Sequence, residues 1–225
     1  MISNENTNTL PLPRLFLSKK VAFSAAVLLI FHLVGIWGLV FSGNAIYYQQ
    51  LTPLNLLLTN LLLFINHRNF TRAFFLFAGI TFLASFLAEV IGVHTGLLFG
   101  EYAYGEALGL KLWNVPLLIG LNWLMLVYCA GAVARKWFKN YLSAAFAGAT
   151  IMTLLDFLIE PVAMQTDFWS WHNNNIPAFN FVCWFGLALL LQLLFQKLEI
   201  NRTNPLASLV LLTQTVFFLV LNLFL

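Results

Sequence analysis

Three carboxylic acids lie within long apolar runs of this sequence, where ionisable side chains are rare. Glu89 follows the run "FLASFLA", and Asp156 and Glu160 stand within "TLLDFLIEP". The last two are four residues apart, so a helix places them on one face. Like charges at this spacing repel, and burial disfavours the charged form, so we expect at least one of them to hold its proton near neutral pH. The acids therefore predict a site for proton transfer.

Aromatic residues could complete such a site, because they make up 16% of the chain. Trp123 and Trp184 each follow a proline by seven residues, after Pro116 and Pro177. This spacing places both indoles about two turns into a helix, which is deeper than an interfacial belt requires. Acids that hold protons, next to electron-rich rings, suggest chemistry on a hydrophobic alkene. Protonation of a trisubstituted alkene gives a tertiary carbocation, which aromatic faces can stabilise. The shared order of acid, aromatic loop, proline and Trp also suggests a parallel internal repeat.

The composition indicates that these residues sit in a membrane. Hydrophobic residues make up 61% of the chain and charged residues only 8%, against about 25% charged in a soluble domain. Seven apolar segments approach the roughly 20 residues that a spanning helix needs. We therefore predict an all-α, polytopic integral membrane bundle of about seven transmembrane helices. The predicted spans are 21–41, 50–66, 73–93, 115–134, 141–160, 178–196 and 205–224.

Two of these spans carry helix-breaking or polar residues. The span 50–66 is the weakest, because Pro53, Asn55 and Asn60 interrupt it. The span 141–160 precedes Pro161, which we expect to end or to bend that helix.

Charge placement orients the bundle. With a cytoplasmic N-terminus, ten of the eleven Lys and Arg residues fall in inside segments and Lys111 alone falls outside. The C-terminus then lies outside. We expect a polar cytoplasmic tail at 1–20 and a single transmembrane domain at 21–225, in a bacterial inner membrane, with lipid and no nucleic acid around it. Six of the eight acids fall toward the outer side.

Metal and retinal chemistry match the sequence poorly. Metal sites on helices use spacings such as Glu followed by His at i+3, whereas His94 is five residues after Glu89. A retinal Schiff base needs a lysine inside the membrane, and no predicted span has one away from its ends. We therefore expect neither a metal nor another cofactor.

Four ordered motifs carry a family resemblance. The stretches "HTGLLFGEYAY", "NVPLLIGLNWLMLVY", "LLDFLIEPVA" and "WSWHNNNIPAFNFVCWF" resemble those of the membrane carotenoid hydratase family, which includes bisanhydrobacterioruberin hydratase and the bacterial carotenoid 1,2-hydratases. The resemblance covers residues 84–195. This chain has Leu98 where relatives often carry proline, and Glu160 where they often carry aspartate.

The resemblance implies a hydro-lyase that adds water to the terminal isopropylidene double bond of an acyclic, lycopene-like or gamma-carotene-like carotenoid end. Carotenoid, water and other carotenoid-pathway enzymes would be its partners. On this hypothesis Asp156 is the general acid, and Glu89 or Glu160 is the general base. The candidate substrate-binding residues are Tyr102, Trp123, Trp169, Trp171, Trp184, Asn122, Asn180 and His94.

Two alternatives remain open from the sequence. A carotenoid cyclase protonates the same double bond but quenches the cation internally. A proton-coupled transporter also uses intramembrane acids and broken helices.

Overall fold

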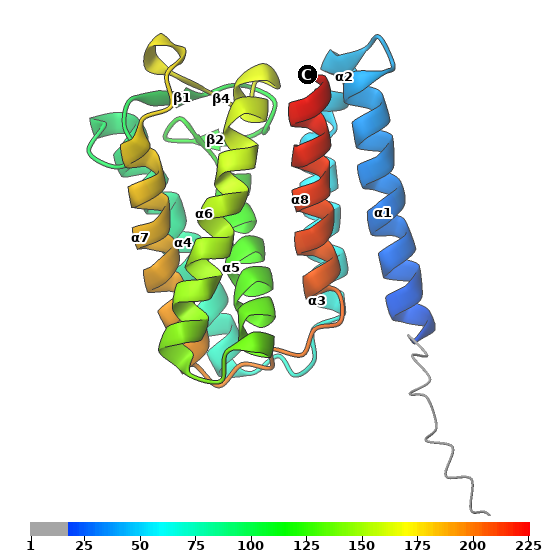
Figure 1. The fold of residues 1–225 in the computed structure, drawn as a ribbon, viewed down its shortest axis with the longest axis vertical. Coiled ribbons are helices and arrows are strands. Elements are labelled where there is room, and N and C mark those ends of the chain that lie inside the picture. Colours follow the sequence, from blue (N-terminus) through cyan, green and yellow to red (C-terminus); the bar gives the residue numbers. More distant parts are fainter. Residues whose placement is uncertain (1–17) are drawn as a thin grey trace, which may run out of the picture.

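The computed structural model describes residues 18–225, and most of them lie in long helices that run side by side (Figure 1). Six helices in this part of the chain are long and apolar enough to cross a membrane. The chain is therefore an integral membrane protein. The helices are α1 (Lys19–Val40), α2 (Ala45–Gln50), α3 (Thr52–Ile65), α4 (Arg72–Thr95), α5 (Leu117–Trp137), α6 (Tyr141–Gln165), the 3-10 turn η1 (His172–Asn174), α7 (Ala178–Lys197) and α8 (Ala207–Phe224).

Four short strands lie in the loops at one end of the bundle. They are β1 (Tyr102–Tyr104), β2 (Lys111–Leu112), β3 (Val115–Pro116) and β4 (Trp169–Trp171). Strand β1 pairs with β4 and β2 pairs with β3, both antiparallel. The sequence predicts only helices, so these strands add to the predicted all-α class without changing it.

The second predicted span, 50–66, is shorter in the structure than a membrane crossing requires. It forms α3, whose 14 residues rise about 21 Å, against a hydrocarbon core of about 30 Å. The predicted total of seven spans is therefore not confirmed, because six of the described helices have the necessary length. Helices α1 and α4 nevertheless run in the same direction, and α3 returns the chain between them (Figure 1).

The predicted N-terminal tail, 1–20, lies almost entirely outside the described residues. Helix α1 begins at Lys19, and the hydroxyl of Ser18 accepts a hydrogen bond from the backbone N–H of Val21 (3.3 Å). This N-cap satisfies one of the free amide groups of the first turn and fixes the start of the helix.

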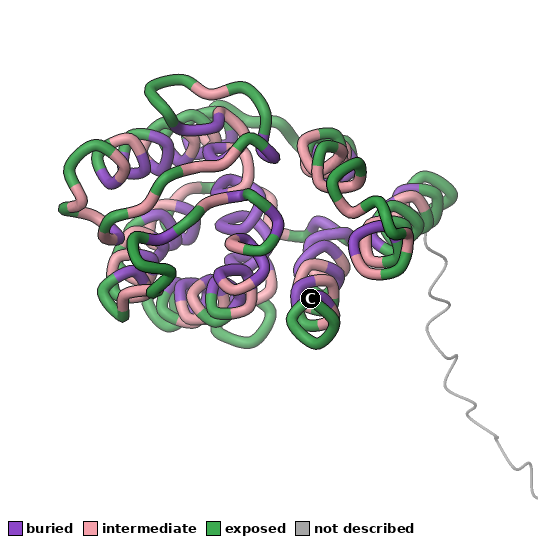
Figure 2. The backbone as a smooth tube through the Cα atoms, turned by 90° about the horizontal axis from the view of Figure 1, so that it is seen from above, coloured by how far each residue is buried: buried purple, intermediate pink, exposed green. Residues whose placement is uncertain are grey.

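The helices form two groups. Helices α4 to α7 make a compact bundle, and α1, α3 and α8 stand beside it (Figures 1 and 2). Helix α5 is central. In its most apolar 18-residue stretch 72% of the residues are buried, against 28% in the corresponding stretch of α1. The outward faces of the other helices expose large apolar side chains, such as Phe75 and Leu83 on α4. These faces suit contact with lipid tails.

Two buried glutamines hold α7 against its neighbours. Gln192 donates to the backbone carbonyl of Val127 (2.9 Å), and Gln196 donates to that of Gly131 (3.0 Å). A Cβ atom at Gly131 would lie 2.5 Å from the Gln192 side chain, and one at Gly148 would lie 2.6 Å from it. Small residues therefore allow α5, α6 and α7 to approach closely, as helices often do in membranes.

Basic side chains gather at the end of the bundle opposite the strands. Nine of the ten described Lys and Arg residues lie there, and Lys111 in β2 is the exception. Arg202 donates to the carbonyls of Phe195 and Gln196 at the end of α7 (2.9 and 3.0 Å). The excess of positive charge predicts that this end faces the cytoplasm.

Cysteine labelling tests whether α3 crosses the membrane. In a Cys183→Ser background, which removes the partly exposed native thiol, a membrane-impermeant maleimide should label Ser42→Cys in intact cells. It should label Phe70→Cys only after permeabilisation, because α3 separates the two loops. Labelling of both positions from the same side would contradict a crossing at α3.

Candidate active site

Helix α6 places two of the three intramembrane acids. It continues through Pro161 to Gln165, so of the two expected outcomes the first is excluded: Pro161 does not end the helix. A proline inside a membrane helix removes one backbone hydrogen bond, and neighbouring groups can compensate for it. Asp156 and Glu160 therefore lie well inside the helix, and both are buried.

Glu89 on α4 accepts three hydrogen bonds. Its Oε2 accepts from the hydroxyls of Tyr102 (2.6 Å) and Tyr104 (2.8 Å), and its Oε1 accepts from the indole N–H of Trp123 (3.0 Å). Gly92, one turn along α4, makes room for this contact, because a Cβ atom there would lie 2.8 Å from the Tyr102 hydroxyl. Three donors around a buried carboxylate stabilise its charged form.

Glu160 on α6 also accepts three hydrogen bonds. Its Oε2 accepts from the indole N–H groups of Trp169 (2.9 Å) and Trp171 (2.6 Å), and its Oε1 accepts from the Nδ2 of Asn180 (2.7 Å). Glu89 and Glu160 therefore have equivalent surroundings: each is buried, and each is surrounded by ring or amide donors.

Asp156 lies one turn deeper on α6 and has fewer partners. Its Oδ2 accepts from the same Nδ2 of Asn180 (3.2 Å), and its buried Oδ1 has no partner among the described residues. The amide of Asn180 thus bridges the carboxyl groups of Asp156 and Glu160. A buried carboxyl group with one weak donor is less costly in its neutral form than in its charged form.

The pairing of β1 with β4 brings the aromatic donors together. The opposed residues are Tyr102 with Trp171, Ala103 with Ser170 and Tyr104 with Trp169. Because side chains alternate along a strand, the four rings share one face of this ribbon. Ala103 and Ser170 are exposed on the other face. The ribbon therefore covers the carboxyl groups with rings on its inner side.

The donors surround a small cavity of about 20 Å³. A polar cavity of roughly 10–15 Å³ or more can hold one water molecule. Both Glu89 and Glu160 line it, whereas Asp156 is not among its lining residues. The cavity thus offers a water-sized space between two carboxyl groups and a set of aromatic rings.

Two stacked indoles form part of the cavity wall. The ring centroids of Trp123 on α5 and Trp184 on α7 are 4.1 Å apart, and the angle between the ring planes is 22°. Pro116 and Pro177 occupy the N-cap positions of these two helices. Both indoles are buried and lie about two turns into their helices.

The two helical hairpins that build the site are arranged alike. Helices α4 and α6 both run toward the strands, and α5 and α7 both run away from them (Figure 1). The connecting strands β1 and β4 are antiparallel and centred on Ala103 and Ser170. An approximate two-fold axis along the bundle would relate the two hairpins in this way. The predicted parallel repeat requires such an arrangement.

The cavity collects most of the candidate residues from the sequence. Its walls include Glu89, Glu160, Tyr102, Asn122, Trp123, Trp169, Trp171, Asn180 and Trp184. His94 lies elsewhere: it is exposed, and its Nε2 lies 3.1 Å from the carbonyl oxygen of Trp113. Sequence reasoning missed Tyr104, although its position two residues after Tyr102 places both on one face of a strand.

The two tyrosines of β1 stay protonated over a wide pH range. Burial raises the pKa of Tyr102 and of Tyr104 well above the usual value of 10.0, and the nearby Glu89 raises both further. Both hydroxyls therefore remain hydrogen-bond donors to Glu89 at physiological pH.

The described residues contain no group of three His, Cys, Asp or Glu side chains arranged to hold a metal ion. The side chains of the site are suited to proton transfer, hydrogen bonding and stabilisation of positive charge.

Comparison with known proteins identifies one family. The family model described as "Carotenoid biosynthesis protein" matches residues 51–225, which include every residue of the site. No curated protein and no solved structure matches the chain.

Alkaline titration tests the buried donors. In detergent-solubilised protein, Tyr102 and Tyr104 should remain un-ionised at pH 10 and above, because their folded-state pKa is raised. The stability that they contribute is present below pH 10 and is lost as the pH rises toward the folded-state pKa. The ultraviolet absorbance of tyrosinate should show a late step on alkaline unfolding, and this step should be smaller in Y102F/Y104F. Ionisation of both tyrosines near pH 10 in the folded protein would contradict the hydrogen bonds to Glu89.

Proposed function

Because the chain belongs to the carotenoid biosynthesis protein family, we propose that it adds water to the terminal isopropylidene double bond of an acyclic carotenoid end. The observation that supports this most directly is the water-sized cavity lined by Glu89 and Glu160. Hydration of an isolated alkene needs an acid, a water molecule and a base, and the cavity brings together groups suited to each.

The proton comes from the pair formed by Asp156 and Glu160. The sequence favours Asp156 as the acid, and its sparse hydrogen bonding favours a neutral carboxyl group there. Glu160, however, is the member of the pair that lines the cavity. We therefore assign delivery of the proton to Glu160 and assign to Asp156, linked to it through Asn180, the supply of that proton.

Glu89 is the proposed base. Its three donors stabilise the carboxylate, and an ionised carboxylate can accept a proton from water. Glu160 has three donors too, but it also shares the Asn180 amide with Asp156, which can supply it with a proton. The proposed role of Asn122, whose side chain also faces the cavity, is to hold water or the product hydroxyl.

The reaction balances without a cofactor. The proton adds to the alkene carbon that bears one hydrogen, and the π electrons form the new C–H bond. The positive charge moves to the carbon that bears two methyl groups, where the faces of Trp123 and Trp184 can stabilise it. Water oxygen bonds to that carbon, and the proton it loses passes to Glu89. The product is a tertiary alcohol, and proton exchange with water restores the acids.

The water-sized space favours hydration over cyclisation. A cyclase must keep water from the same cation, whereas this cavity has room for one water molecule beside both carboxyl groups. The masses of the products separate the two reactions, since a cyclised carotenoid keeps the substrate mass and a hydrated one gains the mass of one water.

Expression in a lycopene-producing host tests the proposal. The wild type should yield pigment heavier by one water, read by mass spectrometry. Glu160→Gln and Glu89→Gln should each lower its formation by about 10²–10⁴-fold, since this is what general acid–base catalysis typically contributes. Asp156→Asn should also lower it, because the proton supply is lost.

Glu101→Gln is the matched control, because this acid precedes β1 directly and its side chain is exposed outside the cavity. It should keep wild-type product levels. Protein levels in the membrane and monodispersity in detergent confirm folding of each variant. A product of unchanged mass would support cyclisation instead, and proton-coupled flux in liposomes without any change of pigment would support transport.

A further inference from the structure

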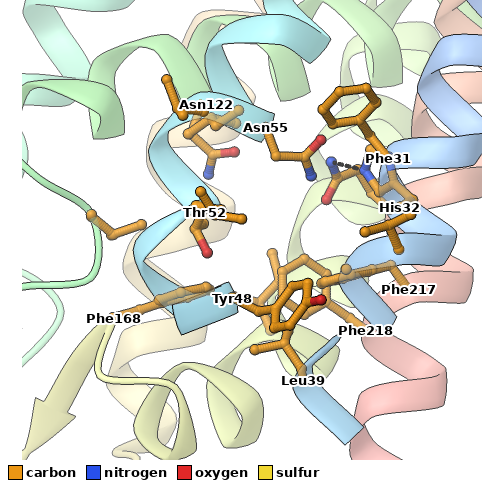
Figure 3. Close-up of a pocket in the computed structure, with 18 of the residues that line it drawn as sticks. Phe31, His32, Leu39, Tyr48, Thr52, Asn55, Asn122, Phe168, Phe217 and Phe218 are labelled. Atoms are coloured by element: carbon orange, nitrogen blue, oxygen red, sulfur yellow. Dashed lines mark hydrogen bonds between the residues drawn. The ribbon is translucent and has the colours of Figure 1, made fainter. Parts of the chain in front are cut away.

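A second, larger pocket lies between the two helix groups. Its volume is about 200 Å³, and it is walled by α1, α3 and α8 on one side and by α5 and α6 on the other (Figure 3). Most of its lining is apolar, with side chains such as Leu39, Leu126, Ile159 and Phe218. A pocket with these walls suits a hydrocarbon group.

This pocket adjoins the small cavity lined by Glu89 and Glu160, called the acid cavity below. Ile119, Asn122 and Trp169 line both spaces. Trp169 is also a hydrogen-bond donor to Glu160. A group held in the larger pocket therefore lies next to the carboxyl groups, separated from them by these shared side chains.

The pocket also reaches the lipid-facing surface. Phe31 and Val34 on α1 and Leu54 on α3 line it, and 48%, 48% and 62% of their surfaces are exposed. Apolar side chains that are exposed on a membrane helix face lipid tails. A hydrocarbon chain dissolved in the bilayer can therefore enter without passing through water.

Its size limits what can enter. An engineered apolar cavity of about 150 Å³ holds a benzene ring, so a pocket of about 200 Å³ accepts a branched group slightly larger than that. This is enough for the last isoprene unit of a chain and too little for a whole carotenoid. The rest of the polyene must stay in the bilayer.

Two walls of the pocket carry polar groups. His32 on α1 and Gln214 on α8 are hydrogen-bonded to each other (3.1 Å), and the others lie on α3 and α5. The side chains of Thr52, Asn55 and Asn122 lie near one another there (Figure 3). The Oδ1 of Asn55 is buried and accepts no hydrogen bond from the described residues. A hydroxyl group on a ligand could donate to it, which suits a pocket that must also accommodate the tertiary alcohol.

We propose that the pocket between α1, α3, α5 and α8 binds the terminal isoprene unit of a linear carotenoid, admits it sideways from the bilayer, and presents its double bond to Glu160 past Trp169 and Asn122. This inference rests on the proposed function for its choice of ligand. It adds the binding site, the route of access and the consequence that one chain end is bound at a time.

Paired tryptophan substitutions test the pocket. Val34→Trp and Leu54→Trp fill it from α1 and α3. Leu33→Trp and Leu61→Trp are the matched controls, because both positions are exposed on the same two helices and do not line the pocket. Each protein is purified in detergent from a lycopene-producing host. Pigment retained per protein is read by absorbance, and product is read by mass spectrometry.

The wild type and both controls should retain pigment. The two pocket variants should retain at most about one tenth as much pigment per protein. Excluding even two buried methylene groups weakens binding by about that factor. Product should fall with retention.

Equal retention by pocket and control variants, or no retention by the wild type, overturns the inference. The two proposals fail in different ways. Loss of pigment in the pocket variants alone, without a mass gain in any strain, supports the pocket and refutes hydration. A mass gain that the pocket variants leave intact supports hydration and refutes the pocket.

Discussion

The structure depends on keeping three carboxyl groups inside a bundle whose outer surface is built for lipid. A buried carboxylate is tolerated only when hydrogen-bond donors replace the water that it loses. Glu89 and Glu160 each receive three donors, and no described basic residue pairs with either. The absence of a salt bridge matters, because a strong ion pair would hold the proton balance fixed. Neutral donors stabilise the charge and still allow a proton to come and go.

Those donors determine much of the surrounding fold. The indoles and phenols that reach the acids belong mainly to β1 and β4, so the loops must pair in one register. A slip by one residue would turn the two rings of one strand to the opposite face from those of the other. Helix α5 supplies the remaining indole, and its Asn122 lines both the acid cavity and the apolar pocket. The most buried helix of the bundle therefore forms the boundary between the space for the proton chemistry and the proposed space for the substrate.

The sequence predicts the helices and the acids better than the loops. Apolar blocks of membrane length are a strong signal, and α1 and α4 to α8 have that length. Acids within such blocks are a second signal, and those of α4 and α6 are buried. The short α3 and the continuation of α6 through Pro161 depend on tertiary packing, which hydropathy does not contain. The pairing of "YAY" with "WSW" is a contact between residues 65 to 69 positions apart, so no local pattern reveals it. The larger pocket was also missed, because its lining residues come from helices far apart in the sequence and most of them resemble ordinary apolar packing residues.

The donors of each acid all come from the hairpin that carries the acid. Glu89 is satisfied by residues of β1 and α5, and Glu160 by residues of β4 and α7. Each hairpin therefore carries the donors that its own glutamate needs, and the pairing of β1 with β4 turns the rings among them toward the carboxyl groups. Inserting one hairpin at a time would thus bring each glutamate into the bilayer together with its donor residues. The burial of the acids is thus divided between two hairpins, and neither hairpin depends on the other for its donor residues.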